Sequence, residues 1–288
     1  MISIFGIIFT FAMVFGGYLL AGGKLDIILK SLPFEIMIIC GAAIGAFMLS
    51  NPVPVIKATL GDLKKVFGGS IWQPNDYVEL LLLLNHLLLV ARRNPMELDI
   101  HLDAPEKSEI FAVCPKVLED CTAVDMICDT LRSASMNYTD PLQIEDLLEK
   151  KIEDKKHHQD ISVHALQAVA DGLPALGIVA AVLGVIKTMG SIDQPPEVLG
   201  KLIGGALVGT FLGVFLAYCL VAPFSSKVKA TANNDINFYR VIKEVMVSYF
   251  QSHPVKTCLE VARQSIPHDF RPQHAVLEDA IRNKKPNV

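Results

Sequence analysis

The chain has 288 residues, of which 51% are hydrophobic and 19% are charged, and its formal net charge is -4. It is too apolar for an ordinary soluble protein and too charged for a fully embedded one. A net negative chain without a basic stripe is also not typical of a nucleic-acid-binding protein. The composition therefore predicts a protein with both membrane-embedded and aqueous parts.

The first two membrane helices are predicted close to the N-terminus. Residues 2–21 carry no charge and are long enough to cross the hydrocarbon layer, so we place the first transmembrane helix at residues 1–22. No basic residue precedes this run, which argues against a cleaved signal peptide. The second helix is placed at residues 34–52, where a face of small residues is followed by Pro52 and Pro54. Residues 22–33 are expected to form an external link between the two spans.

Two further membrane helices are predicted in the second half of the chain. The third, at residues 171–192, contains one lysine, Lys187, whose long side chain can reach the interface. The fourth, at residues 201–224, has the longest uncharged run. A leucine-rich stretch at residues 78–91 is shorter and is interrupted by polar side chains, so we expect a buried or interfacial helix there and not a fifth span.

The remaining segments are expected to be helical and to lie in the cytoplasm. Residues 53–170 and the tail at residues 225–288 carry most of the Lys and Arg residues, which places them and both termini on the cytoplasmic side. Apolar spacing from Leu142 to Ala170 predicts a long helix that continues into the third span. The polar, Lys-rich end of the tail is expected to be disordered. The predicted fold is an all-α integral membrane protein with four transmembrane helices, a large helical cytoplasmic loop and a cytoplasmic C-terminal helical tail.

The sequence offers no candidate site for enzyme chemistry, a cofactor or a metal ion. It contains no Gly-rich phosphate loop, nucleophile elbow or H-E-x-x-H motif. Cys114, Cys121 and Cys128 recur every seven residues in a stretch with helical character, which predicts a buried face of small apolar side chains. We therefore expect neither catalytic nor metal-binding residues.

The last two spans contain a pattern that favours ion conduction. Small residues recur every four positions in the fourth span, and similar ones occur in the third (Gly205, Gly209, Gly213 and Ala217; Gly177, Ala181 and Gly184). This pattern fits tight helix packing or the lining of a pore. Thr210, Pro174 and Pro223 favour a hydrated or moving interface, because hydroxyls and freed carbonyls in hydrocarbon need partners. No Asp, Glu or His is placed in the middle of any predicted span, so a proton-accepting carboxylate must come from another chain.

These residues resemble a known family. The runs LPALGIVAAVLGVI from residue 173 and GTFLGVFLAYCLVAPF from residue 209 resemble the MotA family of flagellar stator subunits, as do residues 108–111 and 169–171. The resemblance covers nearly the whole chain. It implies a bacterial inner-membrane assembly in which several copies surround a dimer of MotB-like chains, whose single transmembrane helix supplies the proton-accepting Asp.

The resemblance also implies roles for single residues. Pro174 and Pro223 match two prolines that couple ion passage to movement, and Asp171 and Thr210 match positions beside the ion path. Sodium-driven relatives carry Thr where this chain has Ala181, which favours protons as the transported ion. Each residue also has a structural interpretation: the prolines as helix terminators, Asp171 as an interfacial cap, and Thr210 as a donor to its own backbone.

The family further presents one basic and one acidic residue to the rotor protein FliG. The acid corresponds to Asp99 or Glu97, and the base to Arg92 or Arg93 after a shift of one or two residues. The alternative is a solvated charged loop, in which an exposed pair contributes less than about 1 kcal/mol. Two rival functions remain: an ExbB- or TolQ-like energy-transducing subunit, which would have three spans, and a membrane scaffold without ion flow.

Overall fold

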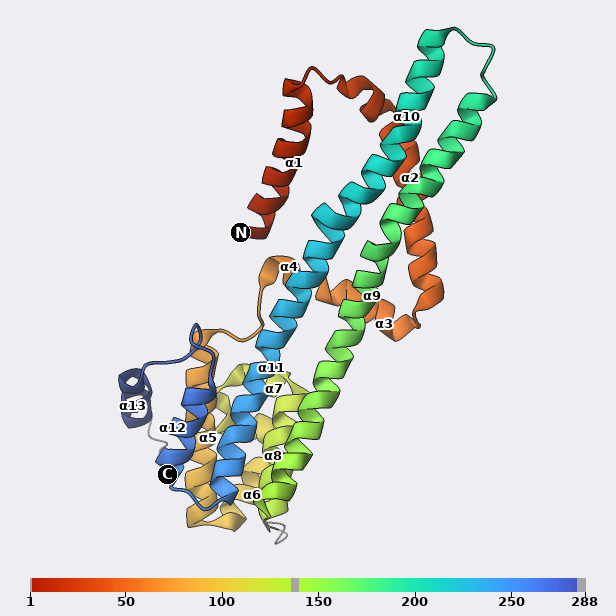
Figure 1. Ribbon diagram of the computed structural model, residues 1–288. Helices are drawn as coiled ribbons and strands as arrows, with labels where there is room; N and C mark the ends of the chain where they lie inside the picture. The colour runs from red at the N-terminus through yellow and green to blue at the C-terminus, as the bar shows by residue number, and fades with distance from the viewer. Residues whose placement is uncertain (1, 136–139, 284–288) are drawn as a thin grey trace. The chain divides into compact units, whose positions relative to one another are not determined.

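A computed structural model describes residues 2–135 and 140–283, and all regular secondary structure within these residues is helical. The chain divides into two compact units (Figure 1). We call Met1–Gly69 with Gln159–Thr231 the membrane unit, and Ser70–His158 with Ala232–Val288 the helical unit. The Lys-rich C-terminal end, which the sequence predicts to be disordered, lies outside the described residues.

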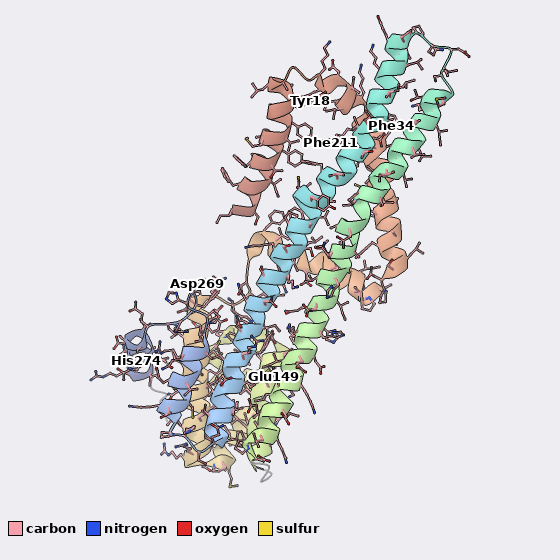
Figure 2. The ribbon with its side chains drawn as sticks, viewed as in Figure 1. Tyr18, Phe34, Glu149, Phe211, Asp269 and His274 are labelled. Carbon is pink, nitrogen blue, oxygen red and sulfur yellow. The ribbon has the colours of Figure 1, made fainter. Side chains whose placement is uncertain are left out.

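The membrane unit contains four helices that are long and apolar enough to cross a bilayer, as predicted. These are α1 (Ile2–Leu20), α2 (Leu25–Ser50), the C-terminal part of α9 (Pro141–Met189) and α10 (Pro196–Phe215). Helix α2 packs along α10. Helix α1 contacts α10 through aromatic rings: Phe15 meets Phe211 edge-on with ring centroids 6.0 Å apart. Phe211 is labelled on α10 in Figure 2.

Helix α2 differs from the prediction in where it begins. It starts at Leu25, whereas the sequence placed a link at residues 22–33 and the span at residues 34–52. Pro33 does not interrupt it, because a proline is tolerated inside a membrane helix whose neighbours satisfy the freed backbone groups. As a consequence, Glu35 is the eleventh residue of a 26-residue helix, whereas the predicted span placed it at its second position.

After α2 the chain forms two short helices, α3 (Val53–Asp62) and α4 (Lys65–Gly68). Val66 of α4 is buried against Val163 and Val228, which come from α9 and the beginning of α11. The Ser3 hydroxyl donates a hydrogen bond to the Val66 carbonyl at 2.9 Å. This small cluster joins three segments of the membrane unit, each of which is close in sequence to the boundary with the helical unit.

The helical unit is built around α5 (Pro74–Arg93), which contains the leucine-rich stretch at residues 78–91. Most of α5 is buried in the core of this unit, which confirms the prediction that it is not a span. Trp72 stacks on Phe238 with ring centroids 3.6 Å apart. The other helices of this unit are α6 (Pro95–Asp103), η1 (Pro105–Lys107), η2 (Phe111–Val113), α7 (Pro115–Glu119), α8 (Cys121–Ser135), α12 (Val255–Ser265) and α13 (His274–Asn283), with parts of α9 and α11.

The three evenly spaced cysteines do not share one helix face. Cys114 precedes α7 and Cys121 begins α8, so a break at residue 120 separates them. Cys114 and Cys128 are buried, but Cys121 is exposed. The prediction of a common buried face is therefore wrong, because Pro115 and the break at residue 120 interrupt the helical pattern.

Two long helical stretches contribute residues to both units. Helix α9 is 49 residues long, which confirms the predicted helix that runs into the third span. Helix α10 continues through a π-helical turn, η3 (Leu216–Val221), into α11 (Ala222–Phe250). The fourth span and the first part of the tail are therefore one continuous stretch, and no helix end occurs at residue 224.

Candidate functional site

The contact between α9 and α10 brings two backbones together. A Cβ atom placed on Gly213 would lie 2.7 Å from Gly177 Cα and 2.7 Å from the Leu173 carbonyl oxygen. One placed on Gly184 would lie 2.7 Å from the Ala206 side chain. Real Cβ contacts are longer than this, so only glycine fits at these positions. The small residues of the third and fourth spans are needed for this close approach.

Two other glycines of α10 face α2. A Cβ on Gly205 would lie 2.8 Å from the Ser31 hydroxyl oxygen, and one on Gly209 would lie 2.6 Å from Glu35 Oε2. The glycine-rich face is therefore covered within the chain by α2 and α9. Of the two interpretations that the sequence left open for this face, the structure supports tight packing.

The faces of α9 and α10 that point away from this packing are apolar and exposed. On α9 the stripe consists of Ile178, Val182 and Val185, with exposed fractions between 48% and 57%. On α10 the corresponding residues are Ile203, Leu207 and Val214, Tyr218 of η3 continues the stripe, and the half-buried Thr210 lies at the same helical spacing. Apolar surface of this kind in a membrane helix contacts lipid or another chain.

Two predicted residues of the ion path lie on the α9 stripe. Asp171 is exposed, and Gln167 Nε2 donates a hydrogen bond to its Oδ1 at 2.9 Å. Pro174 is half-buried inside α9 without ending it, so it does not act as a helix terminator. Because proline has no N–H, the carbonyl of Ala170 loses its intrahelical partner. Asp171, Pro174 and Ile178 share one face of α9, because successive members of this set are three and four residues apart.

Ala181 packs against Gly209, the residue that precedes Thr210. The Ala181 backbone nitrogen is 3.2 Å from a Cβ placed on Gly209, the residue before Thr210. Within the described residues the Thr210 hydroxyl makes no hydrogen bond, whereas the Thr188 hydroxyl donates to the Gly184 carbonyl at 2.9 Å. The interpretation of Thr210 as a donor to its own backbone is thus not what the structure shows.

Pro223 follows the π-helical turn. It is exposed and lies in the first turn of α11, and the preceding Ala222 N–H donates to the Ala217 carbonyl, five residues back. The turn accommodates the missing N–H of Pro223 by widening the helix by one residue. Like Pro174, Pro223 is therefore inside a continuous helical stretch. The sequence gives no direct signal for the π-helical turn.

The two arginines predicted to face the rotor differ in their surroundings. Arg92 Nη2 donates to the His253 carbonyl, and its guanidinium lies over the Tyr249 ring at 5.6 Å. Arg93, the last residue of α5, is exposed. The candidate acids Glu97 and Asp99 lie in α6 and are half-buried. All four residues belong to the helical unit, on either side of the break at Asn94.

Comparison with known families places the chain in one of them. Residues 4–95 match the motility protein A N-terminal family and residues 122–240 match the MotA/TolQ/ExbB proton channel family. The chain is 35% identical to motility protein A of Escherichia coli over 99% of its own length and 96% of that protein. The chain belongs to the motility protein A family. Chemotaxis protein LafT of Vibrio parahaemolyticus is also 35% identical, over 95% of both chains.

Solved structures of the motility protein A family share this fold. The C. jejuni MotAB structure matches with a TM-score of 0.73 and 22% identity, covering 94% of this chain and 98% of that one. The MotAB stator complex of Bacillus subtilis matches with a TM-score of 0.68 and 22% identity, covering 98% of each chain. Both likenesses support an all-helical membrane fold with four spans and a large helical loop.

One polar residue of the membrane unit was missed by the sequence reasoning. Glu35 is only 7% exposed and lies in the middle of α2, among α9 and α10. The sequence contained a signal for it: Glu35 is followed directly by Ile-Met-Ile-Ile, and the apolar spacing of Leu25 to Leu29 already belongs to the same helix. The charges of Asp26 and Lys30 placed the predicted start of this span too late.

Proposed function

We propose that this chain is the ion-conducting stator subunit of a bacterial flagellar motor, in which proton influx drives torque on the rotor. The observation that carries the proposal is the 35% identity to motility protein A of Escherichia coli over nearly the full length of both chains. The exposed apolar stripes of α9 and α10 support it, because they leave a membrane surface for other chains.

The proposed partners are further copies of this chain and a MotB-like protein with one transmembrane helix. Several copies surround a partner dimer, whose Asp accepts the proton near the α9 and α10 stripes. Asp171, Pro174 and Thr210 lie at positions where such a helix would meet the chain. The complex resides in the bacterial inner membrane with both termini of this chain in the cytoplasm. Its role is transport and mechanical coupling, not enzyme catalysis.

The proposed ion is the proton. Ala181 offers no hydroxyl oxygen as a sodium ligand, and its backbone nitrogen packs against Gly209, which has no side chain to offer one. A proton that crosses about 150 mV releases roughly 3.5 kcal/mol, which is enough to bias a two-state packed interface. An ExbB- or TolQ-like role is disfavoured by the four spans and by the motility proteins among the relatives.

The proposed contact with the rotor protein FliG uses Arg93 and an acid of α6. Arg92 is occupied by the His253 carbonyl and the Tyr249 ring, so Arg93 is the basic residue that is available. Charge reversal, Arg93→Glu, should weaken torque, and Arg92→Ala should instead lower the stability of the helical unit. Torque recordings of single motors and thermal unfolding of the purified complex separate these two effects.

The central test uses the two prolines. Pro174→Ala and Pro223→Ala are introduced into cells that lack their own copy of this subunit and express the MotB-like partner. We expect lost swimming and reduced proton influx at normal membrane levels, because alanine restores the N–H and stiffens the helix. Pro196→Ala is the matched control, since Pro196 lies in the first turn of α10, where no N–H is required. Unchanged swimming and influx in both variants would refute the coupling role.

A further inference from the structure

Glu35 is a buried carboxyl group inside the membrane unit. It is the eleventh of the 26 residues of α2, is 7% exposed, and its Oε2 atom has no hydrogen-bond partner within the described residues. An uncompensated carboxylate is expensive in hydrocarbon. A buried carboxyl group without a hydrogen-bond donor therefore either carries a proton or draws a cation toward it.

The packing of three helices makes room for this carboxyl group. Oε2 lies 2.6 Å from the position that a Cβ on Gly209 would occupy, so the absence of a side chain on α10 creates its place. A Cβ on Gly209 would also lie 3.1 Å from Ala180 Cβ and 3.2 Å from the Ala181 nitrogen of α9. Glu35 thus lies beside the segment of α9 and α10 that includes Ala181 and borders Thr210.

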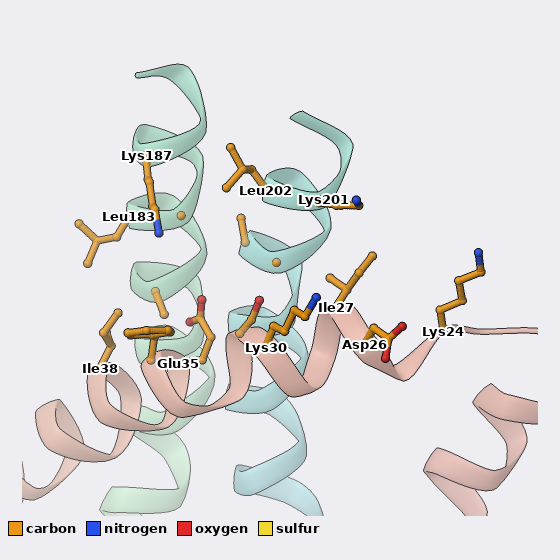
Figure 3. A pocket seen from close by; sticks show the side chains of 16 residues that line it. Lys24, Asp26, Ile27, Lys30, Glu35, Ile38, Leu183, Lys187, Lys201 and Leu202 are labelled. Carbon is orange, nitrogen blue, oxygen red and sulfur yellow. The ribbon is translucent and has the colours of Figure 1, made fainter. Parts of the chain in front are cut away.

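A cavity of about 680 Å³ opens from Glu35 toward the end of the membrane unit that carries the α1–α2 and α9–α10 connections. Figure 3 shows Glu35 at its inner side and charged side chains from α2, α9 and α10 around it. Besides Glu35, the charged lining residues are Lys24, Asp26, Lys30, Lys187 and Lys201. None of these lysines forms an ion pair with either carboxylate among the described residues. The cavity is large enough for water, and its charged groups can bind it.

These surroundings act on Glu35 in opposite directions. Burial disfavours a charge on its carboxyl group, and four lysines near the cavity favour one. Lys187 extends along α9 in the direction of Glu35, so its ammonium group can approach a charged carboxylate (Figure 3). A purely structural carboxyl group would have a fixed donor, and Oε2 has none. The arrangement fits a group that gains and loses a proton.

We propose that Glu35 is a proton-binding site of this subunit, loaded from water in the cavity. Loading transfers a proton from hydronium to Oε2, which forms an O–H bond and leaves neutral water. Release breaks that bond, returns the proton to an acceptor water and restores the carboxylate. The neutral form rests against Gly209 without a counter-ion, and the charged form draws a lysine into the cavity. This inference rests on the proposed function as a proton-driven subunit.

The functional test compares Glu35→Gln, which cannot titrate, with Glu35→Asp, which can. Glu197→Gln is the matched control, because Glu197 is an exposed glutamate of the same unit. Proton influx and swimming speed are followed from acidic to alkaline medium in cells with the MotB-like partner. We expect a several-fold lower influx and a flat pH response for Glu35→Gln, wild-type behaviour for Glu197→Gln, and partial recovery for Glu35→Asp. A wild-type pH profile for Glu35→Gln overturns the inference.

A spectroscopic test separates this inference from the proposed function. Infrared difference spectra of the purified wild-type complex should contain a protonated-carboxyl band that titrates with pH and is absent from Glu35→Gln. This result supports the inference even if the wild-type chain conducts no protons, which would refute only the proposed function. Absence of such a band at every pH overturns the inference. Equal losses of activity and melting temperature in Glu35→Gln and Glu35→Asp, with no change in the band, also overturn it.

Discussion

Replacing Gly213 by alanine tests the close approach of α9 and α10. The new Cβ would lie 2.7 Å from both Gly177 Cα and the Leu173 carbonyl oxygen. Carbon atoms in contact prefer about 3.5 Å or more, so the helices must separate by about 0.8 Å. Both neighbours are backbone atoms and cannot turn away. Overpacking of this kind costs about 1–3 kcal/mol.

Part of this cost is offset, because alanine favours a helix over glycine by about 1 kcal/mol. At the upper end of the overpacking range, the free energy that stabilises the packed helix pair should therefore fall by about 2 kcal/mol. This corresponds to about a 30-fold shift of the equilibrium away from the packed pair. The measurement is thermal stability of the detergent-solubilised complex by size exclusion after heating. Gly45→Ala in α2 is the control, since a Cβ there meets nothing within 4 Å. Equal stability of Gly213→Ala and Gly45→Ala would refute the reasoning.

Three further predictions concern the helical unit. Trp72→Ala should destabilise this unit by about 3–5 kcal/mol, because it removes a buried ring stacked on Phe238, and limited proteolysis of the purified complex should detect the loss. Maleimide labelling followed by mass spectrometry should modify the exposed Cys121 before the two buried thiols of the same stretch, whose pKa values burial raises to about 12 and about 11. The hydrogen bonds from Arg263 lower the pKa of Glu260 from 4.5 to about 2, so this pair stabilises α12 above about pH 4.5 and loses its effect as the pH falls toward 2. Acid unfolding of Arg263→Ala should therefore begin at a higher pH than that of the wild type, and an unchanged acid transition would contradict the assignment.

Much of the membrane fold could be predicted from hydropathy. Three uncharged runs and a fourth that contains only Lys187 identify four spans, because hydrocarbon requires about twenty apolar residues to cross it. The prediction that residues 78–91 do not form a span is confirmed, since the polar side chains of this stretch need partners that a protein core supplies. The beginning of α2 was not predictable in this way. Hydropathy registers the charges of Asp26 and Lys30, and it does not register that the helix continues through them.

For the candidate site, the sequence predicts that helices approach closely but not which helices meet. Glycine spacing predicts close helix approach, and the structure confirms it at Gly177 and Gly213. The same spacing does not reveal which neighbour covers each glycine, because that depends on how three helices are placed around α10. Only the structure shows that Glu35 lies against Gly209, and that Arg92 is held by a carbonyl from the C-terminal part of the chain.

The two prolines illustrate why local rules alone do not predict the site. In water a proline inside a helix costs about 3 kcal/mol and usually ends or kinks it. In this chain α9 continues through Pro174, and α10 reaches Pro223 through a π-helical turn whose Ala222 N–H bonds five residues back. Each proline leaves a carbonyl without its usual donor, and both lie in the parts of these stretches that belong to the membrane unit. Helices that are continuous but locally weakened can bend there without unfolding, which is the property that the proposed coupling role requires.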